Sequence, residues 1–153
     1  MHPTPKFHPT TLTTVSPGPQ VPAPRLKPAI LLLNGNHYVS AVIWTLLNHF
    51  GFEIVSETSG PIGLELARSL FPDAVVLDVN LPGMNGLEIC RRLKADPATD
   101  TLPVIFCTGQ VYLADEAMEL GAAAFLDEMS GVIQLPDCLR KILSARTAGS
   151  DAV

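Results

Sequence analysis

The sequence has little that would place the protein in a membrane or a secretory pathway. No apolar run approaches the length of about 20 residues that a membrane-spanning helix needs, and the first residues lack the apolar segment of a signal peptide. There are only three cysteines, Cys90, Cys107 and Cys138, with no CxxC pair and no His/Cys cluster that would bind zinc. We therefore expect free thiols in a reducing cytoplasm and no membrane partner.

Basic residues are scarce outside the first 28 residues. The segment 1–28 contains Lys6, Arg25 and Lys27 and no acidic residue, whereas the remainder combines seven basic with fifteen acidic residues. A folded part with this excess of acid is poorly suited to nucleic acid, because phosphate binding requires a basic surface. We therefore expect no nucleic-acid partner.

Proline is concentrated near the N-terminus. Eight of the fourteen prolines fall in residues 1–28, mixed with threonine, and such a stretch neither propagates a helix nor pairs as a strand. We predict a disordered arm at 1–28, which serves either as a solvated linker or as a Pro-rich docking motif. A single domain is predicted for residues 29–145 and a flexible tail for residues 146–153.

Within the predicted domain, strand and helix patterns alternate. Short apolar runs predict strands at 29–33, 52–57, 74–78, 103–108 and 123–126. Apolar residues at helical spacing predict helices at 39–50, 61–71 and 86–96, then at 114–120 and from about 136 onwards. In the second helix, Ile62, Leu66 and Leu70 are expected to face the core. Five βα units predict an α/β, flavodoxin-like three-layer sandwich with parallel strand order 2-1-3-4-5.

The residues that follow the strands are the candidate functional residues, because function in such sheets lies beyond the carboxyl ends of the strands. Asp78 directly follows the apolar run AVVL, and a charged acid in this position is costly unless its charge is used. Thr108 ends the fourth predicted strand, and Asp127 and Glu128 follow the fifth.

The segment LDVNLPGMNGLEICRRLKADPATDTLPVIFCTG, with ELGAAAFL further on, closely resembles the receiver domain of two-component response regulators of the chemotaxis-regulator type. The likeness runs from about Ala29 to Leu143. It implies that Asp78 is the position phosphorylated by a histidine kinase, that Thr108 contacts the phosphoryl group, and that Phe125 is the switch aromatic. It also implies Mg²⁺ held by two acids after the first strand, by Asp78 and by the carbonyl of Asn80.

The sequence departs from that family at the positions that supply charge. Asn34 and Gly35 take the places of the acidic pair, and Glu128 takes the place of a lysine. With Asp78 and Asn80 as the remaining metal positions, the Mg²⁺ site is degraded, and Glu128 would repel a phosphoryl group.

Two functional hypotheses stay open. The first is a stand-alone, atypical receiver domain that binds a protein partner, with no cofactor and with weak or no phosphorylation. The second is a functional phosphoreceiver that uses Mg²⁺ and takes phosphate from a histidine kinase at Asp78. No Gly-rich phosphate loop, nucleophile–base pair or GxSxG motif is present, so an enzyme is not expected. Partner contacts are expected on the face formed by the fourth helix, the fifth strand and the fifth helix, as the resemblance implies.

Structural explanations compete for several of these residues. Asp78 could be a relic whose carboxylate bonds to Thr108, Asn34 and backbone amides of the loops. Thr108 could instead cap the helix that follows it, and Asn36 suits the N-cap of the first helix. Phe125 could be an ordinary core residue, and a core position is also expected for the single tryptophan, Trp44.

Overall fold

The computed structural model describes residues 25–151, with side chains up to residue 147. Five strands form one sheet, in which every neighbouring pair runs parallel and the order is β2-β1-β3-β4-β5. This confirms the predicted α/β, flavodoxin-like fold and its strand order. The strands are β1 (Ala29–Leu33), β2 (Glu53–Glu57), β3 (Ala74–Leu77), β4 (Val104–Thr108) and β5 (Ala124–Asp127).

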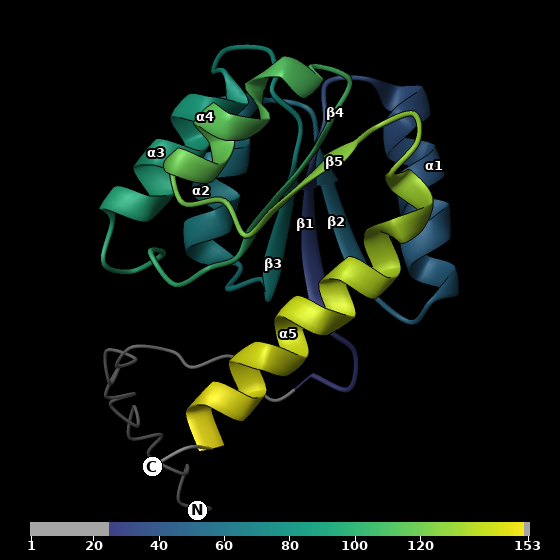
Figure 1. Ribbon diagram of the computed structural model, residues 1–153, viewed down its shortest axis with the longest axis vertical. Coiled ribbons are helices and arrows are strands. Elements are labelled where there is room, and N and C mark those ends of the chain that lie inside the picture. Colours follow the sequence, from purple (N-terminus) through teal and green to yellow (C-terminus); the bar gives the residue numbers. More distant parts are fainter. Residues whose placement is uncertain (1–24, 152–153) are drawn as a thin grey trace, which may run out of the picture.

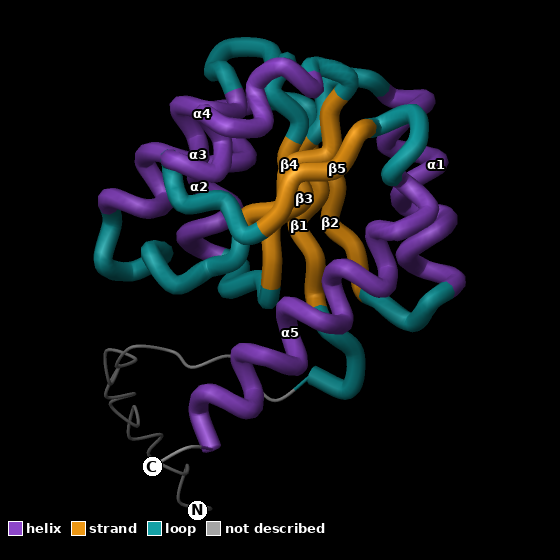
Figure 2. Tube along the Cα trace, viewed as in Figure 1, coloured by secondary structure: helices purple, strands orange, loops and turns teal. Residues whose placement is uncertain are grey.

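Helices cover both faces of the sheet and give three layers (Figures 1 and 2). One face carries α2, α3 and α4, and the other carries α1 and α5. The helices are α1 (His37–His49), α2 (Gly60–Ser69), α3 (Gly86–Ala95), α4 (Ala114–Glu119) and α5 (Leu135–Asp151), and short 3-10 turns at Val111–Leu113 and Val132–Gln134 precede α4 and α5.

The three central strands are apolar apart from Thr108 at the end of β4, because both of their faces are covered. Every residue of β3 and β4 is buried, as are the last four of β1. Their side chains divide into two clusters, one on each side of the sheet. At about 1.5–3 kcal/mol for each fully buried aliphatic side chain, the burial of these strands contributes strongly to stability. They thereby fix the position of the loops at their carboxyl ends.

Short polar side chains cap the N-termini of the first three helices. Asn36 accepts hydrogen bonds from the backbone N–H groups of Tyr38 and Val39, which confirms the predicted N-cap of α1. Ser59 and Asn85 cap α2 and α3 in the same way. Gly51 directly follows the C-cap residue of α1 and has a φ of 88°. Glycine adopts this left-handed backbone conformation without strain.

The face that α2 turns to the core differs from the prediction. Ile62 and Leu70 are exposed, whereas Gly60, Gly63, Leu64 and Ala67 are buried. A Cβ atom on Gly63 would lie 2.6 Å from a methyl group of Leu33. The small residues therefore let α2 approach β1 closely. Leu64 is buried beside them and Leu66 packs partly against the same cluster, whereas Ile62 and Leu70 are exposed.

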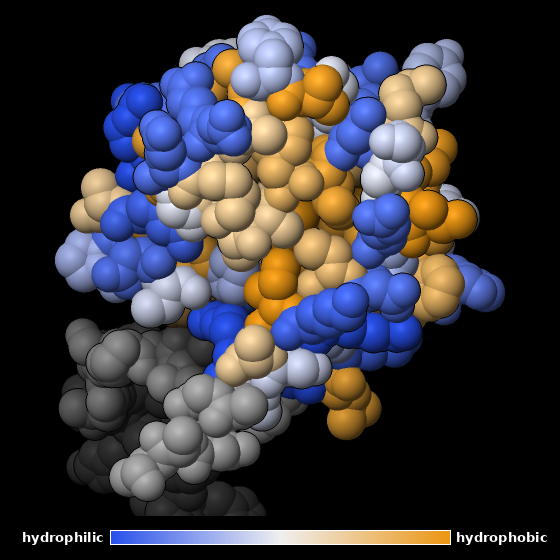
Figure 3. All heavy atoms as spheres, viewed as in Figure 1, coloured by the Kyte–Doolittle hydropathy of each residue, from blue (hydrophilic) through white to orange (hydrophobic). Residues whose placement is uncertain are grey.

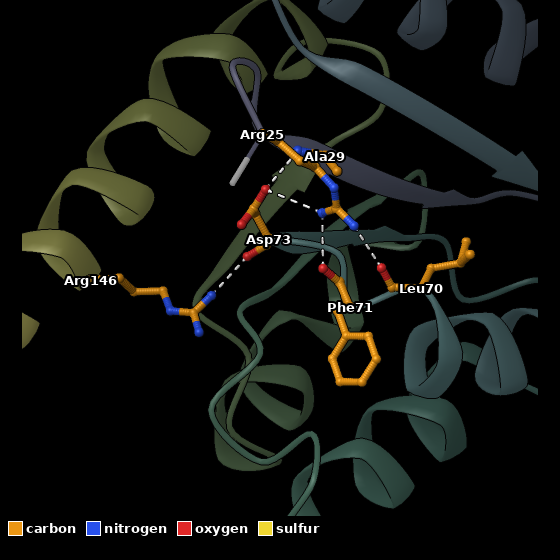
Figure 4. Close-up of polar contacts among 6 residues, drawn as sticks. All are labelled: Arg25, Ala29, Leu70, Phe71, Asp73 and Arg146. Atoms are coloured by element: carbon orange, nitrogen blue, oxygen red, sulfur yellow. Dashed lines mark hydrogen bonds and ion pairs between the residues drawn. The ribbon is translucent and has the colours of Figure 1, made fainter. Parts of the chain in front are cut away.

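The domain boundaries extend beyond the predicted ones. The helix α5 continues to Asp151, so the tail predicted from residue 146 is wrong for 146–151, and Arg146 donates a hydrogen bond to the carbonyl of Asp73 at 2.9 Å. Of the predicted arm, residues 1–24 lie outside the described residues, but residues 25–28 are attached to the domain. Arg25 contacts the loop before β3, as Figure 4 shows. None of the helices in the described part of the chain has the length and apolarity required to span a membrane.

Candidate functional site

The loops at the carboxyl ends of β1, β3, β4 and β5 surround an open cleft of about 580 Å³. The cleft brings together most of the predicted site residues, because adjacent parallel strands end at the same edge of the sheet. Its lining consists of Gly35, Asn36, Asp78, Asn80, Leu81, Pro82, Thr108, Gly109, Gln110 and Glu128.

Asp78 lies at the floor of this cleft and is only 8% exposed. Its carboxylate accepts a hydrogen bond from the backbone N–H of Val79 at 2.7 Å, and its own N–H donates to the carbonyl of Leu33 at 2.8 Å. Gly86 at the start of α3 packs against it so closely that a Cβ there would lie 2.0 Å from the carbonyl oxygen of Asp78. The backbone of Asp78 is therefore held firmly, while one side of its carboxylate faces the cleft.

Thr108 ends β4 and lines the same cleft, but it is not bonded to Asp78. Its hydroxyl oxygen accepts a hydrogen bond from the backbone N–H of Gln110 at 3.3 Å. The following 3-10 turn and α4 have no side-chain cap, so the alternative in which Thr108 caps the next helix is wrong. The hydroxyl of Thr108 stabilises the turn that leaves the strand.

The residues after β1 form a tight turn in place of an acidic pair. Asn34 is buried, and its side-chain oxygen accepts from the backbone N–H of Asn36 at 2.8 Å. The side chain of Asn34 therefore serves the turn, and no hydrogen bond joins it to Asp78 among the described residues. Of the alternative in which the Asp78 carboxylate bonds to Thr108, Asn34 and backbone amides of the loops, the described residues contain the backbone-amide bond, from the N–H of Val79, and neither of the two side-chain bonds.

Gly35 lies against the loop that follows β3. A Cβ at this position would be 2.8 Å from the carbonyl oxygen of Asn80 and 3.2 Å from the ring of Pro82. The space that a side chain would need is thus filled by backbone of the neighbouring loop. This contact involves two of the predicted site positions, Gly35 and Asn80, and no sequence feature other than the glycine itself pointed to it.

Glu128 enters the cleft from the end of β5. Burial and the negative charge of Asp78 raise the pKa of the Glu128 carboxyl, while a hydrogen bond from the backbone N–H of Gly109 lowers it. Asp127 adds a further negative charge. Its carboxylate accepts from the N–H of Met129 and from the hydroxyl of Ser130, so Asp127 is engaged by the loop after the strand.

The cleft contains acidic groups without a matching cation. None of its lining residues within the described range is Lys or Arg. The ion pairs among residues 25–147 lie elsewhere, at Arg25–Asp73, Arg68–Asp96, Arg91–Glu88 and Arg92–Glu88. The described residues also include no group of three or more His, Cys, Asp or Glu side chains that could hold a metal ion.

The two aromatic positions differ from each other. Phe125 in β5 is half-buried and stacks on Phe106 with the ring centroids 6.1 Å apart. Trp44 is 43% exposed, so the expectation of a core tryptophan is wrong. It lines a groove at the edge of β2 whose lining shares no residue with that of the cleft.

Sequence comparison gives the family. The model of the response regulator receiver domain matches residues 30–138. The transcriptional regulatory protein AfsQ1 of Streptomyces coelicolor is 37% identical over 83 residues, which cover 54% of this chain and 36% of AfsQ1. The sporulation initiation phosphotransferase F of Bacillus subtilis is 24% identical over 118 residues, which cover 77% of this chain and 95% of that protein.

The chain spans only part of several relatives that it matches. It covers 36% of the length of AfsQ1 and 17% of the response regulator PleD of Caulobacter vibrioides, to which it is 39% identical over 77 residues. The comparison therefore concerns the receiver portion of those longer proteins.

Solved structures agree with this family. The BeF3-activated receiver domain of RstA from Klebsiella pneumoniae has a TM-score of 0.69 and 25% identity, and the match covers 75% of this chain and 97% of that one. The receiver domain of the sensor histidine kinase PA1611 from Pseudomonas aeruginosa, with a magnesium ion coordinated in its active site cleft, shares the fold with a TM-score of 0.71 at 22% identity, over 77% of this chain and 98% of that one. Fold, strand order and family match agree, and this chain belongs to the response regulator receiver domain family of two-component signalling.

Proposed function

We propose that this receiver domain acts as a protein-interaction module whose function does not depend on phosphorylation of Asp78. The observation that carries the proposal is the charge of the cleft. Asp78 and Glu128 face one space, Asp78 contributes to the raised pKa of Glu128, and no basic side chain lines that space within the described residues.

Phosphoryl transfer to a carboxylate requires positive charge near the acceptor. The incoming group carries negative charge on its equatorial oxygens, and catalysis of such transfers depends on cations that neutralise it. In this cleft the position where the family has a lysine holds a glutamate. A phosphoryl group on Asp78 would therefore meet repulsion from Glu128 where it needs attraction.

The residues present do not fit Mg²⁺. This ion is small, dehydrates reluctantly and depends on carboxylate ligands in octahedral geometry. Gly35 supplies no ligand, and the carbonyl of Asn80 lies too close for a carboxylate side chain to be added at position 35 without moving the loop. The amide oxygen of Asn34 is already used by the turn. Asp78 and the carbonyl of Asn80 remain, which is too small a donor set.

Two surfaces support a role in protein binding. Apolar side chains gather over the middle of the α4–β5–α5 face in Figure 3. All four residues of β5 are partly exposed on that side, and Met118 of α4 is 47% exposed.

The second surface is the helix α1, which contains no Asp, Glu, Lys or Arg and exposes Tyr38 and Val42. A surface helix without charge is typical of contact with another protein. The partner that we propose is a histidine kinase or another signalling protein.

Intact-mass spectrometry tests the proposal. The full chain is incubated with acetyl phosphate and Mg²⁺, and the unmodified mass is expected to persist. An adduct of the mass of one phosphoryl group that disappears in Asp78→Ala would reject the proposal. A receiver domain with a complete acidic pair and lysine, treated in parallel, shows that the reagent is active.

A functional phosphoreceiver is the second candidate. The favourable observation is that Asp78 and Thr108 line one cleft, with part of the Asp78 carboxylate facing it. In this case Glu128 would act as an additional metal ligand. The two candidates differ in the effect of Asp78→Asn on the bound partner. Binding that is unchanged by this substitution supports the interaction module, and binding that requires phosphate on Asp78 supports the phosphoreceiver.

A further inference from the structure

A second cavity lies at the opposite end of the molecule from the acidic cleft. It is a groove of about 410 Å³ that follows the start of the edge strand β2. One wall comes from α1 with Trp44, another from the end of α2 and the loop that follows it with Leu70 and Pro72, and the floor comes from β1 and β2. Arg25 and Lys27, which precede β1, complete its lining.

Three large apolar side chains that line the groove are partly exposed. Trp44 is 43% exposed, Val55 in the middle of β2 is 47% exposed, and Leu70 is 36% exposed. Within the described residues, β2 pairs only with β1, so the backbone groups on its other edge have no strand partner. An uncovered edge strand with apolar neighbours is a site of unwanted pairing unless something covers it.

The chain enters the described fold at this groove. The guanidinium group of Arg25 donates hydrogen bonds to the carbonyls of Leu70 at 2.8 Å and Phe71 at 3.0 Å, and it lies 3.8 Å from the carboxylate of Asp73 (Figure 4). The same carboxylate accepts from the N–H of Ala29 at 2.7 Å. These contacts fix the point from which the preceding residues continue, directly beside the groove.

We propose that residues 17–24, with the sequence PGPQVPAP, occupy this groove in the same molecule. Four of these eight residues are proline, and such a segment favours the polyproline II helix, which docks on aromatic-lined grooves at a small entropic cost. Its eight residues span about 25 Å in that conformation, and the five residues of β2 span about 17 Å. The segment is therefore long enough to follow the strand.

The threefold repeat of a polyproline helix would place apolar groups of this segment together. In that conformation Pro19 and Pro22 would share one face, and Val21 and Pro24 would share the next. Because Pro24 is bonded to Arg25, which itself lines the groove, the segment has a high effective concentration there. It contains no acidic or basic residue, so neither Glu53 nor Lys27 of the lining opposes it electrostatically. A partner or second copy would have to compete with this tethered segment.

Acrylamide quenching of the single tryptophan tests the proposal in the full chain. In the natural sequence, Trp44 should be less accessible than in a variant that combines Pro19→Ser, Val21→Ser, Pro22→Ser and Pro24→Ser. The quenching constant should rise by about twofold in the variant, because a docked segment would cover much of the exposed indole surface. The substituted residues lie outside the described fold, and circular dichroism verifies that the domain stays folded.

A matched control carries the same number and kind of changes farther from the groove: Pro3→Ser, Pro5→Ser, Pro9→Ser and Leu12→Ser. This control should quench like the natural sequence. Equal quenching in all three proteins would overturn the proposal, and so would an equal increase in both variants. Protection of Trp44 that disappears on dilution would also overturn it, because a second copy would then be the occupant.

Discussion

Replacing Glu128 by Gln should stabilise the protein at neutral pH. The substitution keeps an acceptor for the N–H of Gly109, and it removes a partly buried charge that is repelled by Asp78. An interaction between partly exposed charges has a magnitude of about 0.5 kcal/mol. For a domain of this size, we expect the melting temperature to rise by about 2 °C.

The pH dependence gives this prediction its sign. The pKa of Glu128 is raised in the folded state above its ordinary value of 4.5, so the folded protein binds this proton more tightly than the unfolded chain does. The destabilisation of the folded state by the ionised Glu128 carboxylate is therefore absent below about pH 4.5. It develops as the pH rises through the pKa of the folded state, and it is complete above that pKa. The advantage of Glu128→Gln should be largest at pH 7 and should vanish as the pH falls towards 4.

Thermal unfolding of the natural protein, Glu128→Gln, Asp78→Asn and the double variant measures this repulsion as a coupling free energy. Each single variant should relieve the same repulsion, so the double variant should gain less than the sum of the two. Glu119→Gln on the exposed surface of α4 is the matched control and should change the melting temperature little. A Glu128→Gln protein that is less stable than the natural one at pH 7, or a gain that persists at pH 4, would refute the reasoning.

Three further predictions concern backbone packing, thiol chemistry and the chain before β1. Gly86→Ala should destabilise the fold by about 3 kcal/mol in urea unfolding, because its Cβ would lie 2.0 Å from the carbonyl oxygen of Asp78; a neutral effect would mean that the loop moves freely. Burial raises the pKa of Cys107 to about 12, so this thiol should stay unmodified by Ellman's reagent at pH 8 until the protein unfolds, and rapid reaction in the native state would contradict this. Asp73→Ala removes the acceptor of the Ala29 N–H and should cost about 1.5 kcal/mol in urea unfolding, more than Arg25→Ala; the reverse order would contradict this.

The fold was largely predictable because its signal is local and repeated. The runs AILLL, AVVL and VIFCT identify strands that are covered on both sides, and the amphipathic pattern of α3 is correct to within one residue. The alternation of such elements leaves few topologies, since parallel strands need crossover helices of one hand.

The errors in the fold arose where packing overrides pattern. In α2 the buried face combines Leu64 with glycine and alanine, which give no apolar signal, so Ile62 and Leu70 were wrongly assigned to the core. The end of α5 has the composition of a tail, yet it continues the helix, and Arg146 contacts the loop before β3.

The site was predictable in its positions and less so in its contacts. Asp78, Thr108 and Glu128 follow strands, and the sheet brings them to one cleft. The use of the Asn34 side chain by its own turn, and the filling of the space at Gly35 by the loop of Asn80, depend on loop geometry that local residue patterns do not reveal.

Binding of a phosphoryl mimic tests the central claim most directly. Fluoroberyllate with Mg²⁺ binds a carboxylate in place of a phosphoryl group, and its bound state gives a separate ¹⁹F NMR signal. Because the cleft around Asp78 lacks a basic side chain among its described lining residues and contains Glu128, we predict no saturable bound signal for the natural protein. A bound signal that saturates with fluoroberyllate and is lost in Asp78→Ala would contradict the claim that this cleft does not accept phosphate.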